Sequence, residues 1–144
     1  MMEAFEIKVF RRNGQLWVSP SVVADVGIKS LPGFLRVDSP VDLPRALEEA
    51  TALALEAQKL PRSERFPPGR PFWEVAGARS WEEFLRGTTA VAIMRSQAQT
   101  RIAHLVRHRE TPMLVPDGAW RELPPDLPLS EVARIVLEEF AAHS

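Results

Sequence analysis

FEIKVFRRNGQLWVS, residues 5–19, carries the clearest secondary-structure signal in this chain of 144 residues. Apolar and polar side chains alternate before Asn13-Gly14, a dipeptide that tolerates the positive φ angles of a two-residue hairpin turn. Pairing across this turn places Phe10 opposite Trp17 on one face of the hairpin. The sequence therefore predicts an antiparallel β-hairpin with one apolar face and one face that sets an aromatic pair among polar residues.

More strands and helices are expected along the rest of the chain. The expected strands are 34–37, 89–95, 101–109, 113–115 and 120–123. The expected helices are 42–60, a short one between Ser80 and Gly87, and 130–142, and the two long ones repeat apolar residues with a period near 3.6. Hairpin strands followed by amphipathic helices predict an α+β fold, an antiparallel sheet covered on one face by helices.

Residues 101–109 fit two kinds of secondary structure. Ile102, Leu105 and Val106 would also suit a helix, but the strands around them and the Pro116-Asp117-Gly118 turn favour a meander of strands. The strand is the preferred interpretation, and the helix stays open as the alternative.

The short helix carries a signal at each of its ends. Ser80 can accept a hydrogen bond at the N-terminus, Glu83 can reach back to the N–H of Ser80, and Gly87 can take the left-handed conformation that ends the helix. Trp81 and Phe84, together with the following leucine, are then expected to face a core. This is the pattern of a structural helix.

The length of the chain suits one domain, residues 1–144, built on one hydrophobic core. Four prolines and Gly69 interrupt all periodicity at about residues 61–72. This segment is therefore expected to be an irregular connection within the domain.

Composition narrows the classes of protein to consider. The 18 basic and 19 acidic side chains nearly cancel, which argues against a broad nucleic-acid surface. There is no cysteine, the N-terminus is acidic, and no apolar run approaches the roughly 20 residues that span a membrane. A soluble cytoplasmic protein with no membrane association is expected.

The sequence lacks the usual supports of catalysis. No serine lies in a Gly-x-Ser-x-Gly elbow, and no glycine-rich loop precedes a helix. His104 and His108 are four residues apart, which is about 13 Å along a strand and too far for one metal ion. Only the helical alternative would bring both rings to one ion, and the His-Glu-x-x-His signature is absent. His143 is expected to be disordered at the C-terminus. We expect no catalytic residue, no metal, no cofactor and no small-molecule ligand.

One segment has a local excess of positive charge. Arg95, Arg101, Arg107 and Arg109 precede the next acid in the sequence, Glu110. If residues 101–109 form a strand, three of these arginines share one face and form a basic stripe that could hold phosphates. A nucleic-acid-binding or regulatory module is therefore the alternative function, although the near-neutral total charge makes it the weaker one.

The second half of the chain resembles a known class of small protein. From Trp73 onward it runs through ARSWEEFLRG (78–87), strands, Pro116-Asp117-Gly118 and LPP (123–125), and then a helix that begins LSEVA (129–133). This order is similar to that of the immunity proteins of bacterial contact-dependent growth inhibition systems, over about the last 70 residues. The resemblance implies a cytoplasmic protein without catalytic activity, which binds the toxic C-terminal domain of a cognate effector, often a nuclease, and blocks its active site.

Candidates for the toxin-binding surface follow from physical arguments alone. Aromatic and arginine side chains that are exposed among polar neighbours supply most of the energy of protein interfaces, and acidic side chains speed the capture of a basic partner. The candidate partner-binding residues are Phe10, Arg12, Trp17, Glu82, Glu83 and Trp120. Trp81 and Phe84 are assigned to the core instead.

Overall fold

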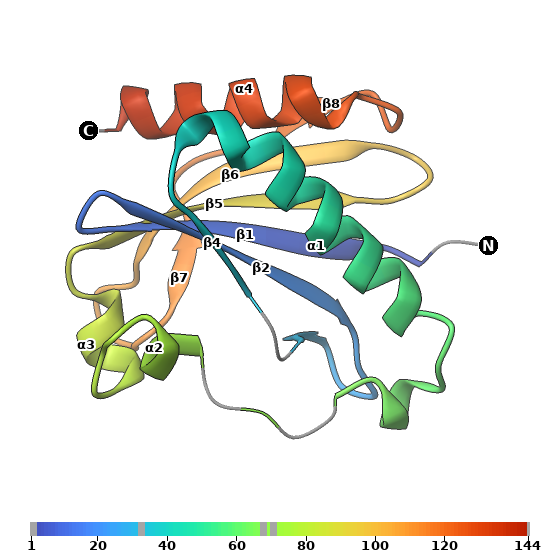
Figure 1. The fold of residues 1–144 in the computed structure, drawn as a ribbon, viewed down its shortest axis with the longest axis horizontal. Helices are drawn as coiled ribbons and strands as arrows, with labels where there is room; N and C mark the ends of the chain where they lie inside the picture. Colours follow the sequence, from blue (N-terminus) through green and yellow to red (C-terminus); the bar gives the residue numbers. More distant parts are fainter. Residues whose placement is uncertain (1–2, 32–33, 67–68, 70–71, 144) are drawn as a thin grey trace.

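The computed structural model describes residues 3–31, 34–66, 69 and 72–143 (Figure 1). Its centre is an antiparallel sheet in which four long strands lie in the order β2-β1-β5-β6. These strands are β1 (Phe5–Arg12), β2 (Gln15–Val23), β5 (Thr88–Arg95) and β6 (Thr100–Arg107). The predicted hairpin is confirmed, since Phe10 pairs with Trp17 and the turn residues Asn13 and Gly14 have φ angles of 51° and 75°.

Each outer long strand carries two short strands along its edge. These are β3 (Ile28–Ser30) and β4 (Leu35–Val37) on β2, and β7 (Leu114–Pro116) and β8 (Arg121–Leu123) on β6. The predicted strand at 101–109 is confirmed as β6, so the helical alternative is wrong. The expectation that the turn at 116–118 joins two mutually paired strands is also wrong, because the N–H of Asp117 donates to the carbonyl of His104 at 2.8 Å. That bond keeps the chain along β6, and β7 and β8 both pair with it.

Two long helices, α1 (Leu43–Ala57) and α4 (Leu129–Ala142), pack side by side on the first face of the sheet (Figure 1). Pro44 lies in the first turn of α1, where it needs no N–H donor. The main core lies between this helix layer and the inward side chains of the long strands. The sheet contributes Ile7, Val9 and Val91 to this core, and α1 contributes Leu47 together with other buried residues of the two helices. The helices predicted at 42–60 and 130–142 are thereby confirmed, with ends that differ by at most three residues.

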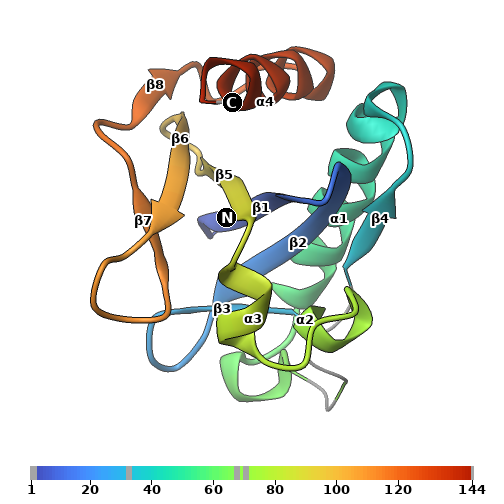
Figure 2. The same cartoon turned by 90° about the vertical axis from the view of Figure 1, so that its left-hand side faces the viewer.

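Two short helices, α2 (Phe72–Val75) and α3 (Trp81–Leu85), lie on the second face, opposite α4 (Figure 2). They cover a smaller core in which Phe10, Phe84, Leu85 and Leu105 are buried. The prediction that helices cover only one face is therefore corrected. The sheet has a large core on its first face and a smaller second core on the other.

Two short 3-10 turns flank α1: η1 (Pro40–Asp42) precedes the helix, and η2 (Arg62–Glu64) follows it at the start of the proline-rich connection. Arg65, next to η2, is buried and donates to the carbonyls of Val23, Gln58 and Leu60 and to the carboxylate of Glu3, at 2.7–3.0 Å. A guanidinium with this many acceptors fixes the start of the connection to β2 and α1.

Candidate interaction surface

All four tryptophans of the chain lie half-buried around the second core. We call this surface the tryptophan face; its members are Trp17 of β2, Trp73 of α2, Trp81 of α3 and Trp120, which precedes β8. Half-buried tryptophan is the side chain most enriched among residues that dominate binding energy at protein interfaces. The geometry therefore marks the second face as the candidate interaction surface.

Helix α3 supports this face and is fixed by contacts at both ends. The N–H of Glu83 donates to the hydroxyl of Ser80 at 3.1 Å, and Gly87 has a φ of 70° beyond the last turn, as the sequence predicted. The guanidinium of Arg12 donates to the carbonyls of Glu83, Phe84 and Arg86 at 2.9, 2.6 and 2.8 Å. These carbonyls are the acceptors that a helix C-terminus leaves without partners inside the helix. Arg12 is thus a C-terminal cap supplied by the hairpin.

The sequence candidates on the hairpin have different surroundings from those expected. Phe10 was expected to be exposed, but it is only 2% exposed and packs edge-to-face on Phe84 with ring centroids 5.3 Å apart. That expectation is wrong because α3, more than 70 residues further on, covers the strand. Trp17, which pairs with Phe10 across the hairpin, is half-buried, and its ring lies 5.9 Å from that of Phe34.

Two tryptophan rings are held by specific contacts. The indole N–H of Trp81 donates to the carbonyl of Pro112 at 2.5 Å, and its ring stacks on that of Phe84. The guanidinium of Arg101 lies 5.0 Å from the ring centroid of Trp120, a cation–π contact. Rings that are already oriented lose less freedom when a partner binds, so these contacts favour a preformed surface.

Sequence reasoning missed part of this surface. Trp73 was not a candidate, and Trp81 was assigned wholly to the core although its ring stays half-exposed. The composition already pointed to such a surface, because the chain has four tryptophans and the sequence offered no other role for them. Glu82 is exposed and Glu83 is half-buried beside this surface, so both carboxylates are near its rim.

The predicted basic stripe is not continuous. Arg101 and Arg107 point to the second face of the sheet, but Arg95 points to the first face and donates to the carbonyls of Pro125 and Leu127 at 3.0 and 2.7 Å. Burial lowers the pKa of the Arg95 guanidinium. Arg109 follows the end of β6. The stripe therefore reduces to two arginines on the sheet, one of which stacks on Trp120.

The histidines lie on different parts of the fold. His104 is buried on the first face beneath the end of α4, whereas His108 bonds to its own loop through Glu110 and Thr111. His143 was expected to be disordered, but it is ordered: its ring stacks on that of His104 with centroids 3.9 Å apart. Burial first, and then the nearby His143, lower the pKa of His104 below its ordinary value, so its neutral form is favoured.

The architecture defines a small α+β protein: an antiparallel sheet with interrupted edges, two long helices on one face and a tryptophan-lined second face. Among the helices of the described ranges, none has the length and apolarity to cross a membrane. No family model and no curated protein matches the sequence.

Solved structures share this fold. A chain of the CdiA-CT/CdiI toxin and immunity complex from Yersinia pseudotuberculosis matches with a TM-score of 0.61 at 13% identity, over 96% of this protein and 98% of that chain. A protein of unknown function from Neisseria meningitidis matches with a TM-score of 0.65 at 12% identity, over 97% and 95% of the two chains. The resemblance suggested by the sequence is thereby confirmed in fold.

Proposed function

We propose that this protein is an immunity protein, which binds and neutralises the C-terminal toxin domain of a cognate contact-dependent inhibition effector. The observation that carries the proposal is the shared fold with a chain of a toxin and immunity complex over nearly the whole length of both chains. In this proposal the protein acts in the cytoplasm, by binding alone and without catalysis. A nuclease is the toxin activity to test first.

The tryptophan face is the proposed docking surface. Its four half-buried indoles offer large apolar contacts around the second core, and Glu82 and Glu83 add negative charge at the rim. Negative charge would attract a basic partner such as a nuclease that binds nucleic acid. Of the residues that the sequence suggested, Trp17, Trp120, Glu82 and Glu83 keep this proposed role, whereas Phe10 and Arg12 support the surface from beneath.

The function is tested with the toxin domain encoded next to this protein's gene, in an inactive form for calorimetry and an active form for growth rescue. Nanomolar affinity together with rescue is the expected result. Absence of both for that pair would contradict the proposal.

The docking surface is tested separately with Trp120→Ala and Trp17→Ala. Each is expected to weaken toxin binding at least tenfold, since indoles at interface centres contribute about 2 kcal/mol or more. Leu53→Ala is the matched control, because Leu53 is an apolar side chain, 44% exposed, on α1. If only the control variant lost affinity, the docking surface would be the helix layer instead.

A further inference from the structure

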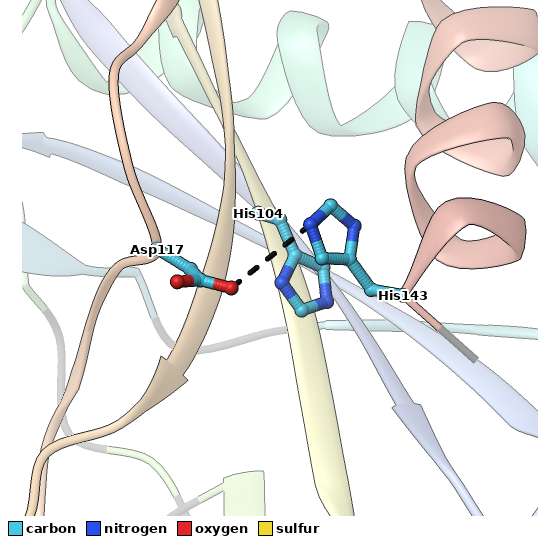
Figure 3. A group of neighbouring side chains, drawn as sticks. All are labelled: His104, Asp117 and His143. Atoms are coloured by element: carbon cyan, nitrogen blue, oxygen red, sulfur yellow. Dashed lines mark ion pairs between the residues drawn. The ribbon is translucent and has the colours of Figure 1, made fainter.

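Three side chains from separate parts of the chain meet beneath the C-terminal end of α4 (Figure 3). His104 comes from β6, Asp117 from the segment between β7 and β8, and His143 from the residue after α4. Each offers one ligand atom, and these atoms all lie within 4.8 Å of one another. We call this group the histidine cluster.

His104, the buried member of this cluster, lacks hydrogen bonds at its ring. His104 is 4% exposed, and neither of its ring nitrogens has a hydrogen-bond partner among the described residues. Leaving a buried polar group without a partner is unfavourable, because the group has lost its hydrogen bonds to water and gained none in the protein. A ligand at the cluster that bonds to one of these nitrogens would remove that cost.

The chemistry of the three groups selects the class of ligand. Two imidazoles and one carboxylate are the ligands that zinc and neighbouring transition metals bind, whereas calcium and magnesium prefer oxygen alone. The charges near the two rings are the carboxylates of Asp117 and Glu139 and the guanidinium of Arg11, and Arg121 lies 4.0 Å from the Glu139 carboxylate. Asp117 places a carboxylate beside the two rings, and this anionic ligand favours a cation.

Binding requires a small movement of the outer residues. The two rings now stack with an angle of 5° between their planes, so their in-plane lone pairs do not converge. Nε2 of His143 lies 4.0 Å from the carboxylate of Asp117, while ligand atoms of a tetrahedral zinc ion lie about 3.3 Å apart. His143 and Asp117 are 32% and 53% exposed, which leaves both side chains room to turn. Nδ1 of His143 lies 2.9 Å from the carbonyl of Glu139, so Nε2 is the nitrogen left for an ion.

We propose that His104, Asp117 and His143 bind one divalent transition-metal ion of the zinc class, with water completing the coordination. The ion joins β6, the β7–β8 segment and the end of α4, and so ties the terminal helix to the sheet. This site differs from the pair His104 and His108 that the sequence excluded, and it revises the expectation that the protein binds no metal.

The test is calorimetric titration of the full chain with Zn²⁺ and, separately, with Mg²⁺, together with thermal unfolding in each ion. One Zn²⁺ per chain and a rise in melting temperature are expected, with no effect of Mg²⁺. His143→Gln and Asp117→Asn change exposed side chains, so they keep the fold, and each is expected to weaken Zn²⁺ binding at least tenfold. His108→Gln is the matched histidine control and should bind as the wild type does.

Two results would overturn the proposal. One is the absence of Zn²⁺ binding at micromolar concentrations. The other is binding that His143→Gln and Asp117→Asn leave unchanged, or that His108→Gln weakens equally. The ¹⁵N shifts of the histidine rings give a second measure, because Zn²⁺ should shift the resonances of His104 and His143 and spare that of His108.

Discussion

Replacing Arg12 by Ala separates a structural role from a role in partner binding. The sequence suggested that Arg12 contacts a partner, whereas its guanidinium donates to three carbonyls at the end of α3. It also lies 5.6 Å from the centre of the Phe84 ring. We therefore expect Arg12→Ala to lower the free energy of unfolding.

The size of the loss follows from these contacts. A hydrogen bond to a charged group contributes about 1.5–3 kcal/mol, and a cation–π contact about 0.5–1 kcal/mol. The bond to Arg86 is exposed, so water replaces it at little cost. Since one nitrogen, Nη1, makes all of these bonds, they are counted together as one hydrogen bond to a charged group. With the cation–π contact, a total loss of about 2–4 kcal/mol is expected, which lowers the melting temperature by roughly 6–12 °C in a chain of this size.

Urea unfolding followed by far-ultraviolet circular dichroism measures this loss. Arg12→Lys is expected to lose about half as much, because its ammonium keeps the charge but ends one bond short of Nη1, the nitrogen that reaches all three carbonyls. Arg11→Ala is the matched control on the opposite face, where Arg11 makes one long hydrogen bond of 3.5 Å to the carbonyl of Phe140 and lies 4.8 Å from the centre of its ring. The control is expected to lose only about 0.5–1 kcal/mol, from that cation–π contact. The reasoning is refuted if the free energy of unfolding of Arg12→Ala lies within about 0.5 kcal/mol of the wild-type value while the variant loses affinity for the toxin.

Further predictions concern the second core, the acid range and the basic residues. Phe10→Ala should cost about 3–5 kcal/mol by calorimetric unfolding, since the ring is buried; an unchanged melting temperature would mean that the ring is not part of the core. A hydrogen bond from Arg65 lowers the pKa of Glu3. The Glu3–Arg65 pair therefore stabilises the folded protein fully above about pH 4.3, the ordinary pKa of a glutamate, and this stabilisation is lost as the pH falls through the lowered pKa. Urea unfolding should therefore find Glu3→Gln less stable than the wild type at pH 7 and nearly equal at pH 2; an equal gap at both would contradict this. On immobilised RNA and DNA, the wild type and a variant with Arg101→Glu and Arg107→Glu should both elute without retention, and strong retention of the wild type alone would favour a nucleic-acid-binding module.

The sequence predicted those features of the fold that depend on neighbouring residues. The hairpin at β1 and β2 follows from one dipeptide turn and from alternation on either side of it. The ends of α1 follow from Pro44 and Pro61, and the cap of α3 follows from Ser80. In each case the physical cause lies within a few residues of its effect.

The features that were missed depend on partners far away in the sequence. Phe10 looked exposed because its strand gives no sign that α3 will cover it. The pairing of β7 and β8 with β6 was missed because the hydrogen bond between Asp117 and His104 cannot be read from the turn itself. The four tryptophans could be counted in advance, but their gathering on one face depends on four separate elements.

The interrupted edges of the sheet also bear on how the protein behaves at high concentration. A long, unpaired strand edge is a template on which a second molecule can add its own strand, which leads to aggregation. Here β3 and β4 divide one edge, and β7 and β8 the other, into pieces of three residues, each only about 10 Å long. An incoming strand finds few consecutive hydrogen-bonding groups in register. A cell could therefore store this protein in abundance without its molecules joining edge to edge.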